Sequence, residues 1–157
     1  MIRILFICHG NICRSPMAEF VMKDLVAKAG LDGQIYVESA ATSTEEIGND
    51  IHYGTRSKLR AEGIPFTRRA ARRITARDYE NFDYIIGMDS YNMRNIERML
   101  GDDRAHKVYR LLDFTDRAGC DIADPWYTGD FDTTFDEISA GCRGLLERIK
   151  KTDHQFH

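Results

Sequence analysis

The sequence lacks any hydrophobic run of membrane-spanning length and any large excess of charge of one sign. Its N-terminal apolar run covers residues 2–7, far fewer than the roughly 20 residues of a membrane-spanning helix. No signal-peptide cleavage site follows this run. The net charge of −3 gives no reason to expect a nucleic-acid partner. We therefore expect neither a membrane nor a nucleic acid as partner.

The sequence lacks the cysteine patterns that would indicate a structural role. The four cysteines have neither metal-ligand spacing nor a secretory signal, which predicts a reducing compartment, the cytoplasm, and no metal site. Repeats, low-complexity segments and linkers are absent. With 157 residues, 43% hydrophobic and 30% charged, the chain is predicted to form a single domain, 1–157, with a substantial core.

The most informative stretch is residues 8–16, Cys-His-Gly-Asn-Ile-Cys-Arg-Ser-Pro. The apolar run before it predicts a buried strand. Behind it, Pro16 opens a helical pattern to about residue 29, with Ser15 predicted as its cap and Gly30 as its end. A strand, a tight loop and a helix N-terminus form an anion site, because loop amides and the helix dipole face the ligand.

The side chains of this loop predict phosphate chemistry. Arg14 can hold two phosphate oxygens at once, and Gly10 and Asn11 tolerate the left-handed backbone that such a loop requires. Cys8 ends the strand, where a nucleophile would lie beneath a bound phosphate. Amides, a helix N-terminus and an arginine lower the pKa of a cysteine to about 3.5–7.5, so we expect a thiolate.

Two further patterns limit this interpretation. Cys142 and Arg148 repeat the spacing of Cys8 and Arg14, but they lie within a continuous helical pattern and are interpreted as a coincidence. The chain also lacks the Gly-x-x-x-x-Gly-Lys-Ser/Thr loop of nucleotide-binding proteins. Only the first cysteine–arginine pair has the strand, loop and helix that the chemistry needs.

The rest of the chain alternates strands with helices. Strands are predicted at residues 35–38, 84–88 and 107–112. Helices are predicted at residues 53–61, after Thr75 (with Asp78 in a capping box), from the Asp89 cap to about residue 100, and along the apolar face from Phe135 to Ile149. The alternation predicts an α/β fold, a parallel sheet with helices on both faces. Ligands of such sheets bind beyond the carboxyl ends of the strands, where Cys8 lies.

Six motifs, in order along nearly the whole chain, resemble the low-molecular-weight protein tyrosine phosphatases: residues 8–19, 39–43, 47–49, 72–75, 82–89 and 124–127. The resemblance implies a three-layer sandwich around a four-stranded parallel sheet of order 2-1-3-4, with the phosphate loop after strand 1. It also implies hydrolysis of phosphotyrosine in proteins or peptides through a phosphocysteine intermediate, with inorganic phosphate as product. Since Arg14 and the loop amides hold the phosphate, neither a metal nor another cofactor is expected.

The resemblance also assigns roles. Asp124, which by itself resembles an ordinary turn aspartate, matches the proton donor of the family and would then activate water. Asn11 is implied to brace the loop with Ser39. Cys13 is implied to form a reversible disulfide with Cys8; its alternative role is loop packing. The other predicted phosphate-binding and supporting residues are His9, Gly10, Ile12 and Ser15, the last donating its hydroxyl to the thiolate.

Three positions depart from the usual family pattern. His9 replaces an aliphatic residue after the nucleophile. A histidine behind the loop is replaced by Arg68 or Arg69, in a basic run otherwise interpreted as a solvated face. Glu45, which Glu46 follows, stands at a wall position often held by an aromatic residue. These two carboxylates, Trp126 and Tyr127 form the predicted substrate rim. We hypothesise that these carboxylates disfavour acidic phosphopeptides.

Three alternative functions remain open. Protein-arginine phosphatases on this fold tend to carry threonine where this chain has Ile12, whose apolar wall suits an aryl ring. A thiol-coupled arsenate reductase needs further cysteines on a mobile segment, and only Cys120 and Cys142 are available. A non-catalytic phosphate or redox sensor would not need Asp124.

Overall fold

The sheet has four parallel strands in the order β2-β1-β3-β4, which confirms the predicted order. The computed structural model describes residues 1–153. β1 (Ile2–Cys8) pairs with β2 (Ile35–Ala41) on one side and with β3 (Tyr84–Gly87) on the other, and β4 (Val108–Arg110) forms the far edge. β1 is central because residues 4–7 are fully buried, as a strand covered on both faces must be.

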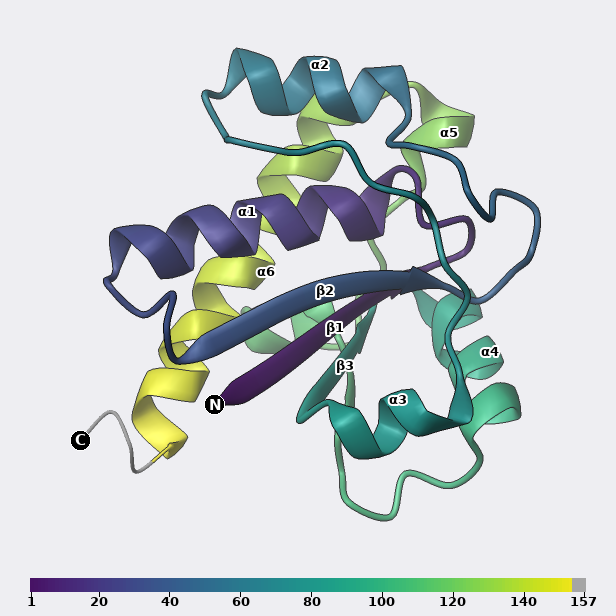
Figure 1. The fold of residues 1–157 in the computed structure, drawn as a ribbon, viewed down its shortest axis with the longest axis vertical. Coiled ribbons are helices and arrows are strands. Elements are labelled where there is room, and N and C mark those ends of the chain that lie inside the picture. The colour runs from purple at the N-terminus through teal and green to yellow at the C-terminus, as the bar shows by residue number, and fades with distance from the viewer. Residues whose placement is uncertain (154–157) are drawn as a thin grey trace.

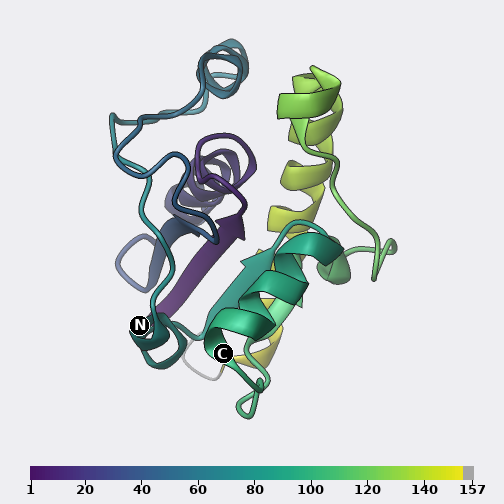
Figure 2. The same ribbon diagram turned by 90° about the vertical axis from the view of Figure 1, so that its right-hand side faces the viewer.

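Helices cover both faces of the sheet and complete three layers (Figures 1 and 2). α1 (Arg14–Lys28) and α6 (Phe131–Thr152) lie on one face, and α3 (Ala76–Asn81) and α4 (Ser90–Leu100) lie on the other. The short α5 (Pro125–Thr128) and α2 (Tyr53–Ala61) lie beside the N-terminal ends of α6 and α1. Among residues 1–153, no helix is long and apolar enough to cross a membrane.

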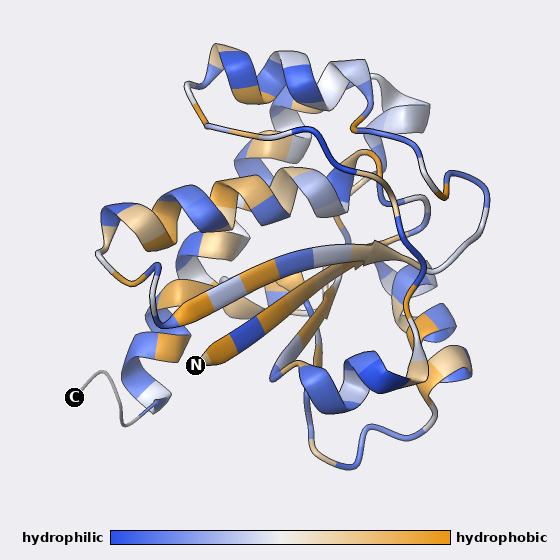
Figure 3. Cartoon of the chain, viewed as in Figure 1, coloured by the Kyte–Doolittle hydropathy of each residue, from blue (hydrophilic) through white to orange (hydrophobic). Residues whose placement is uncertain are grey.

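The alternation of side chains along β1 divides the core in two. Ile4, Phe6 and Cys8 face α1 and α6, whereas Leu5 and Ile7 face α3 and α4. Figure 3 shows mainly hydrophobic residues along β1 and β3, and hydrophobic residues mixed with hydrophilic ones along the helices. Because side chains alternate with a period of two, Cys8 leaves the strand on the side where α1 begins.

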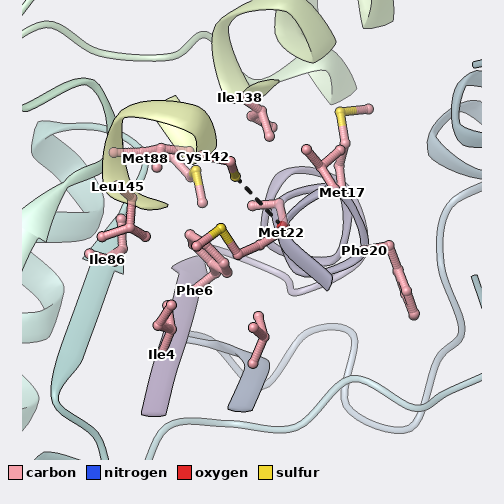
Figure 4. Close-up of a cluster of buried hydrophobic side chains, with 14 of the residues drawn as sticks. Ile4, Phe6, Met17, Phe20, Met22, Ile86, Met88, Ile138, Cys142 and Leu145 are labelled. Carbon is pink, nitrogen blue, oxygen red and sulfur yellow. Dashed lines mark hydrogen bonds between the residues drawn. The ribbon is translucent and has the colours of Figure 1, made fainter. Parts of the chain in front are cut away.

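Cys142 belongs to this core rather than to a second site. It is fully buried on α6, and its Sγ lies 3.7 Å from the carbonyl oxygen of Ala18 on α1 (Figure 4). Burial raises the pKa of this thiol. The interpretation of the Cys142–Arg148 spacing as a coincidence agrees with this placement.

Several predicted boundaries were accurate. The helix at residues 53–61, the Thr75–Asp78 capping box and the Asp89 cap are all present. Gly30 has a φ of 72°, which ends α1 as glycine commonly does.

Other predicted boundaries were wrong. α1 begins at Arg14, and its cap is Cys13, with no capping side chain; Ser15 is therefore inside the helix, and its hydroxyl is used elsewhere. β2 extends to Ala41. β4 has only three residues, because the chain turns at once into a 3-10 helix, η1 (Leu111–Phe114). α5 was not predicted.

Candidate active site

The loop of residues 9–13 joins the end of β1 to α1 and surrounds Cys8. The Cys8 Sγ lies 3.0 Å from the Ser15 hydroxyl and accepts a hydrogen bond from the Ser15 amide at 3.4 Å. Asn11 has a φ of 59°, the predicted left-handed turn. Gly10 does not adopt the left-handed conformation that was predicted for it. Instead, a Cβ at position 10 would lie 3.3 Å from Glu46 Cγ. Glycine at position 10 therefore permits close approach of the rim.

The carbonyl oxygens of the loop are bonded to groups outside it. The donors are Thr42 N to Cys8 O (3.1 Å), Ser43 N to His9 O (3.0 Å), His52 N to Ile12 O (2.9 Å) and Thr55 Oγ1 to Cys13 O (3.2 Å). In contrast, within residues 1–153 no amide of residues 9–14 donates a hydrogen bond. The amides of this loop are available to an anion, and the N-terminus of α1 adds its dipole.

A directed hydrogen-bond network supports the nucleophile. The side-chain amide of Asn11 donates to Ser15 Oγ at 2.8 Å and to Ser39 Oγ at 2.9 Å. Because Ser15 Oγ accepts from Asn11, its own proton is free to point toward Cys8. Ser39 donates to the carboxylate of Glu19 at 2.5 Å. The predicted Asn11–Ser39 pairing is present in this geometry.

Arg14 is buried, with a guanidinium that is only partly occupied. Its Nη1 donates to Asp89 and to the Ile122 carbonyl, both at 2.7 Å, and Nη2 lies 3.4 Å from Asp124. Nε is buried and has no hydrogen-bond partner among the described residues. Burial opposes its charge, but its anionic neighbours, Cys8 first, raise the pKa of Arg14 above its ordinary value. Nε and Nη2 remain for phosphate oxygens.

Asp124 is fixed at the edge of the same site. It caps α5 by accepting from Trp126 N at 3.0 Å, and Pro125 occupies the first helical position, which suits its fixed φ. Its other oxygen faces Arg14. The side chain is 22% exposed, so it contacts both the site and solvent, as a proton-transfer group requires.

A cavity of about 90 Å³ opens above Cys8. One side is the loop, and the other is formed by the predicted rim and Asp124; the lining residues are Cys8, His9, Gly10, Ile12, Cys13, Glu45, Glu46, Asp124, Trp126 and Tyr127. The rim therefore has an acidic side and an exposed aromatic side. His9 crosses toward the acidic side, since its Nε2 lies 3.0 Å from Glu45.

Cys13 is buried beside the nucleophile. Burial, followed by the negative charges of Cys8 and Asp124, raises the pKa of the Cys13 thiol to about 12. Both cysteines are free. Cys13 is therefore a neutral thiol at physiological pH, and its redox role stays a prediction.

The basic run behind the loop is more than a solvated face, so that interpretation was wrong. Arg69, not Arg68, faces the loop: its guanidinium donates to the carbonyl oxygens of Asn11 and Asn49. Arg72 donates from its backbone to Asn11 Oδ1 at 3.2 Å, and its side chain pairs with carboxylates. Arg68 is exposed.

Three contributors were missed as site residues. Asp89 was predicted only as a helix cap, yet it also orients Arg14. Glu19 lies in the quoted motif without an assigned role. The Ile122 carbonyl has no sequence signature, because any residue supplies that group.

The family model and the curated relatives that match this chain carry the name of the same protein family. The model of "Low molecular weight phosphotyrosine protein phosphatase" matches residues 3–155. The low molecular weight protein-tyrosine-phosphatase YfkJ of Bacillus subtilis is 45% identical over 152 residues, 96% of this chain and 97% of that protein. The human low molecular weight phosphotyrosine protein phosphatase is 38% identical over 149 residues, 92% of this chain and 94% of that protein.

Solved structures are similar over the same length. The crystal structure of YfkJ has a TM-score of 0.94 at 44% identity and covers 98% of both chains. A Drosophila arginine phosphatase has a TM-score of 0.85 at 31% identity, covering 98% of this chain and 100% of that chain.

Proposed function

The chain belongs to the low molecular weight phosphotyrosine protein phosphatase family, and on this premise we propose that it hydrolyses phosphotyrosine in proteins or peptides. The observation that carries the proposal is the buried Cys8 thiol beneath free loop amides, with Arg14 Nε unpaired beside it. These groups neutralise a phosphate dianion by themselves. The mechanism therefore needs neither a metal nor another cofactor.

In the first step, the Cys8 thiolate attacks phosphorus in line with the phenolic oxygen. The S–P bond forms as the P–O(aryl) bond breaks, and Asp124 donates its proton to the leaving phenolate. The loop amides and Arg14 hold the three equatorial oxygens. A positioned general acid typically contributes about 10²–10⁴ in rate.

In the second step, the ionised Asp124 takes a proton from water as the water oxygen attacks phosphorus. The S–P bond breaks, inorganic phosphate leaves, and the electron pair returns to sulfur. The Ser15 hydroxyl, 3.0 Å from Sγ, donates a hydrogen bond to the departing thiolate. This bond stabilises the leaving group.

Phosphoarginine is the main alternative substrate, because the fold is shared with a Drosophila arginine phosphatase. Ile12 favours phosphotyrosine, since it lines the cavity with a branched apolar side chain. Arsenate reduction has less support: Cys142 is fully buried in the core, where it cannot resolve an adduct on Cys8. A sensor without catalysis would have no use for Asp124 beside Arg14.

We also propose that the enzyme acts in the cytoplasm. All four cysteines are free thiols, and Cys8 must remain reduced to attack phosphorus. Reducing compartments keep thiols in this state.

The test is a side-by-side turnover assay on phosphotyrosine and phosphoarginine peptides, with chelator and reductant present. We expect phosphotyrosine turnover that Cys8→Ser abolishes and Asp124→Asn lowers by about 10²–10⁴ in kcat. A preference for phosphoarginine would contradict the role of Ile12. Phosphate binding without turnover of either peptide would assign the protein to the sensors.

A further inference from the structure

Residues 69–72 contact the phosphate loop at Asn11: the Arg69 side chain reaches its carbonyl, and the Arg72 amide reaches its side chain. Arg69 is anchored there by its backbone amide, which donates to Asp50 Oδ1 at 3.1 Å. Its guanidinium reaches forward, donating from Nη2 to the Asn11 carbonyl and from Nη1 to the Asn49 carbonyl at 3.2 Å. One side chain thus links Asn49, in the segment that follows Glu45 and Glu46, to the phosphate loop.

The Asn11 carbonyl is the position at which the loop most needs such a partner. Asn11 has a φ of 59°, a conformation that costs a non-glycine residue energy and persists only when surrounding contacts hold it. The carbonyls of Ile12 and Cys13 are held outward by neutral donors of His52 and Thr55. At Asn11 the donor is a cation, and charge-assisted hydrogen bonds are roughly twice as strong as neutral ones.

Arg69 also brings a positive charge to the back of the loop that follows Cys8. Burial lowers the pKa of Arg69, and the negative charges of Glu19, Cys8 and Asp50 oppose that shift; a guanidinium stays protonated in proteins. The attraction between Arg69 and the Cys8 thiolate is mutual. Arg14 extends from the first residue of α1 to Asp89 and Asp124, whereas Arg69 reaches the loop at the Asn11 carbonyl.

The other charged and titratable groups around the sulfur come from each neighbouring element. They are Arg14 and Glu19 of α1, with Asp89 paired to Arg14, His9 and Cys13 of the loop, Glu45 and Glu46 of the rim, and Asp124 before α5. A change confined to Arg69 leaves all of them in place.

We propose that Arg69 is a positioning residue, which holds the Asn11 carbonyl outward so that the loop amides face the phosphate, and which stabilises the Cys8 thiolate from behind the loop. The inference rests on the proposed function in that it assigns Arg69 to the same phosphate site. It concerns two properties of the loop that precede turnover: the reactivity of the Cys8 thiol and the affinity for phosphate.

The test compares Arg69→Gln, which loses the charge, with Arg69→Lys, which keeps the charge and loses the two-pronged donor. Arg68→Gln is the matched control, because it removes the same charge from the exposed neighbouring position. Iodoacetamide alkylation of Cys8 is followed by peptide mass spectrometry against pH. The protection of Cys8 by inorganic phosphate is measured in the same reaction.

For Arg69→Gln, we expect alkylation of Cys8 at neutral pH to slow by about three- to tenfold, because a positive charge near the loop is lost, and protection to need about tenfold more phosphate. Arg69→Lys should keep the wild-type alkylation curve but still need several-fold more phosphate. Arg68→Gln should match the wild type within twofold in both readouts.

Coincident curves for Arg69→Gln and Arg68→Gln would overturn the proposal, as would a loss of thermal stability in Arg69→Gln with unchanged alkylation and protection. If Arg69→Gln does not fold, Arg69→Lys decides: wild-type protection by phosphate would disprove the positioning role. Neither readout uses turnover, so a wild-type protein inactive on phosphotyrosine would reject the proposed function without deciding the role of Arg69.

Discussion

At the scale of single residues, Glu45 lies on the rim of the cavity that opens above Cys8. Its carboxylate bonds His9 at 3.0 Å, while the side chain remains 69% exposed. Glu46 lines the same cavity. An exposed carboxylate acts on a neighbouring peptide charge through water, so its effect on substrate choice is modest and declines with salt.

We expect Glu45→Gln to raise kcat/KM for phosphopeptides with flanking Asp or Glu by about two- to fivefold relative to Lys-flanked peptides, because one repulsive charge is removed. The measurement is the ratio of the two kcat/KM values at low and high salt. Glu147→Gln, at an exposed position on α6, is the control. An unchanged ranking of acidic and basic peptides would show that the rim does not select by charge.

The sequence predicted the placement of the chemically active residues better than that of their supports. Cys8 and Arg14 could be placed because the strand, loop and helix around them are contiguous. Asp89 and the Ile122 carbonyl reach Arg14 from 75 and 108 residues away, and local patterns contain no information on such contacts. Asp124 itself was placed by the family resemblance, since an aspartate before proline is common in turns.

At the scale of elements, the errors concern short or dual-purpose segments. α5 has four residues, too few to show a helical period. Ser15 has the type and position of a helix cap, but its hydroxyl contacts Cys8 and Asn11, and the helix begins before it. Long amphipathic segments such as α4 were predicted correctly because their period repeats several times.

The contact between α6 and η1 depends on a glycine that a helical pattern does not explain. A Cβ on Gly144 would lie 2.0 Å from the Phe114 carbonyl oxygen, a backbone atom that cannot move independently. Glycine lowers helix propensity by about 1 kcal/mol relative to alanine. Its presence in the middle of α6 is therefore explained by close packing.

We expect Gly144→Ala to lower the free energy of unfolding by about 1–3 kcal/mol, despite the better helix propensity of alanine, because α6 must move away from η1. Urea denaturation followed by circular dichroism measures the change. Gly33→Ala is the control, since a Cβ there has nothing within 4 Å. Equal stability of the two variants would mean that the contact is not tightly packed.

At the scale of the whole molecule, the alternation of strands and helices was enough to predict a parallel sheet with a site at its carboxyl edge. The strand order was not contained in the periodicity and came from the family resemblance. The order places β1 between β2 and β3. Cys8 consequently lies where the connections from β1 leave the sheet, which is the usual ligand position in such folds.

The buried thiols predict how the whole fold responds to alkaline pH. Cys13 has its pKa raised from 9.0 to about 12, and the pKa of Cys142 is raised by complete burial. Below about pH 9 the folded and unfolded chains both keep these protons. Above it, the unfolded chain releases them first, so stability falls as pH rises.

Each buried thiol should remove up to about 1.4 kcal/mol of stability per pH unit in this range. We expect Cys142→Ala to show a shallower loss of stability between pH 9 and 10.5 than the wild type, whatever its offset at pH 7. The measurement is urea denaturation at several pH values. The exposed Cys120→Ala should keep the wild-type slope, and a wild-type slope in Cys142→Ala would contradict the expectation.

The directed network behind Cys8 also determines where protons can travel. Asn11 donates to Ser15 and Ser39, and a side-chain amide does not release its proton at any physiological pH. Asn11 therefore interrupts proton transfer along the hydrogen-bond chain that runs from Cys8 through Ser15, Asn11 and Ser39 to the Glu19 carboxylate. The groups behind Cys8 supply hydrogen bonds but no path for protons. In the proposed mechanism, every proton of the two steps therefore passes through the open side of the cavity, which Asp124 lines.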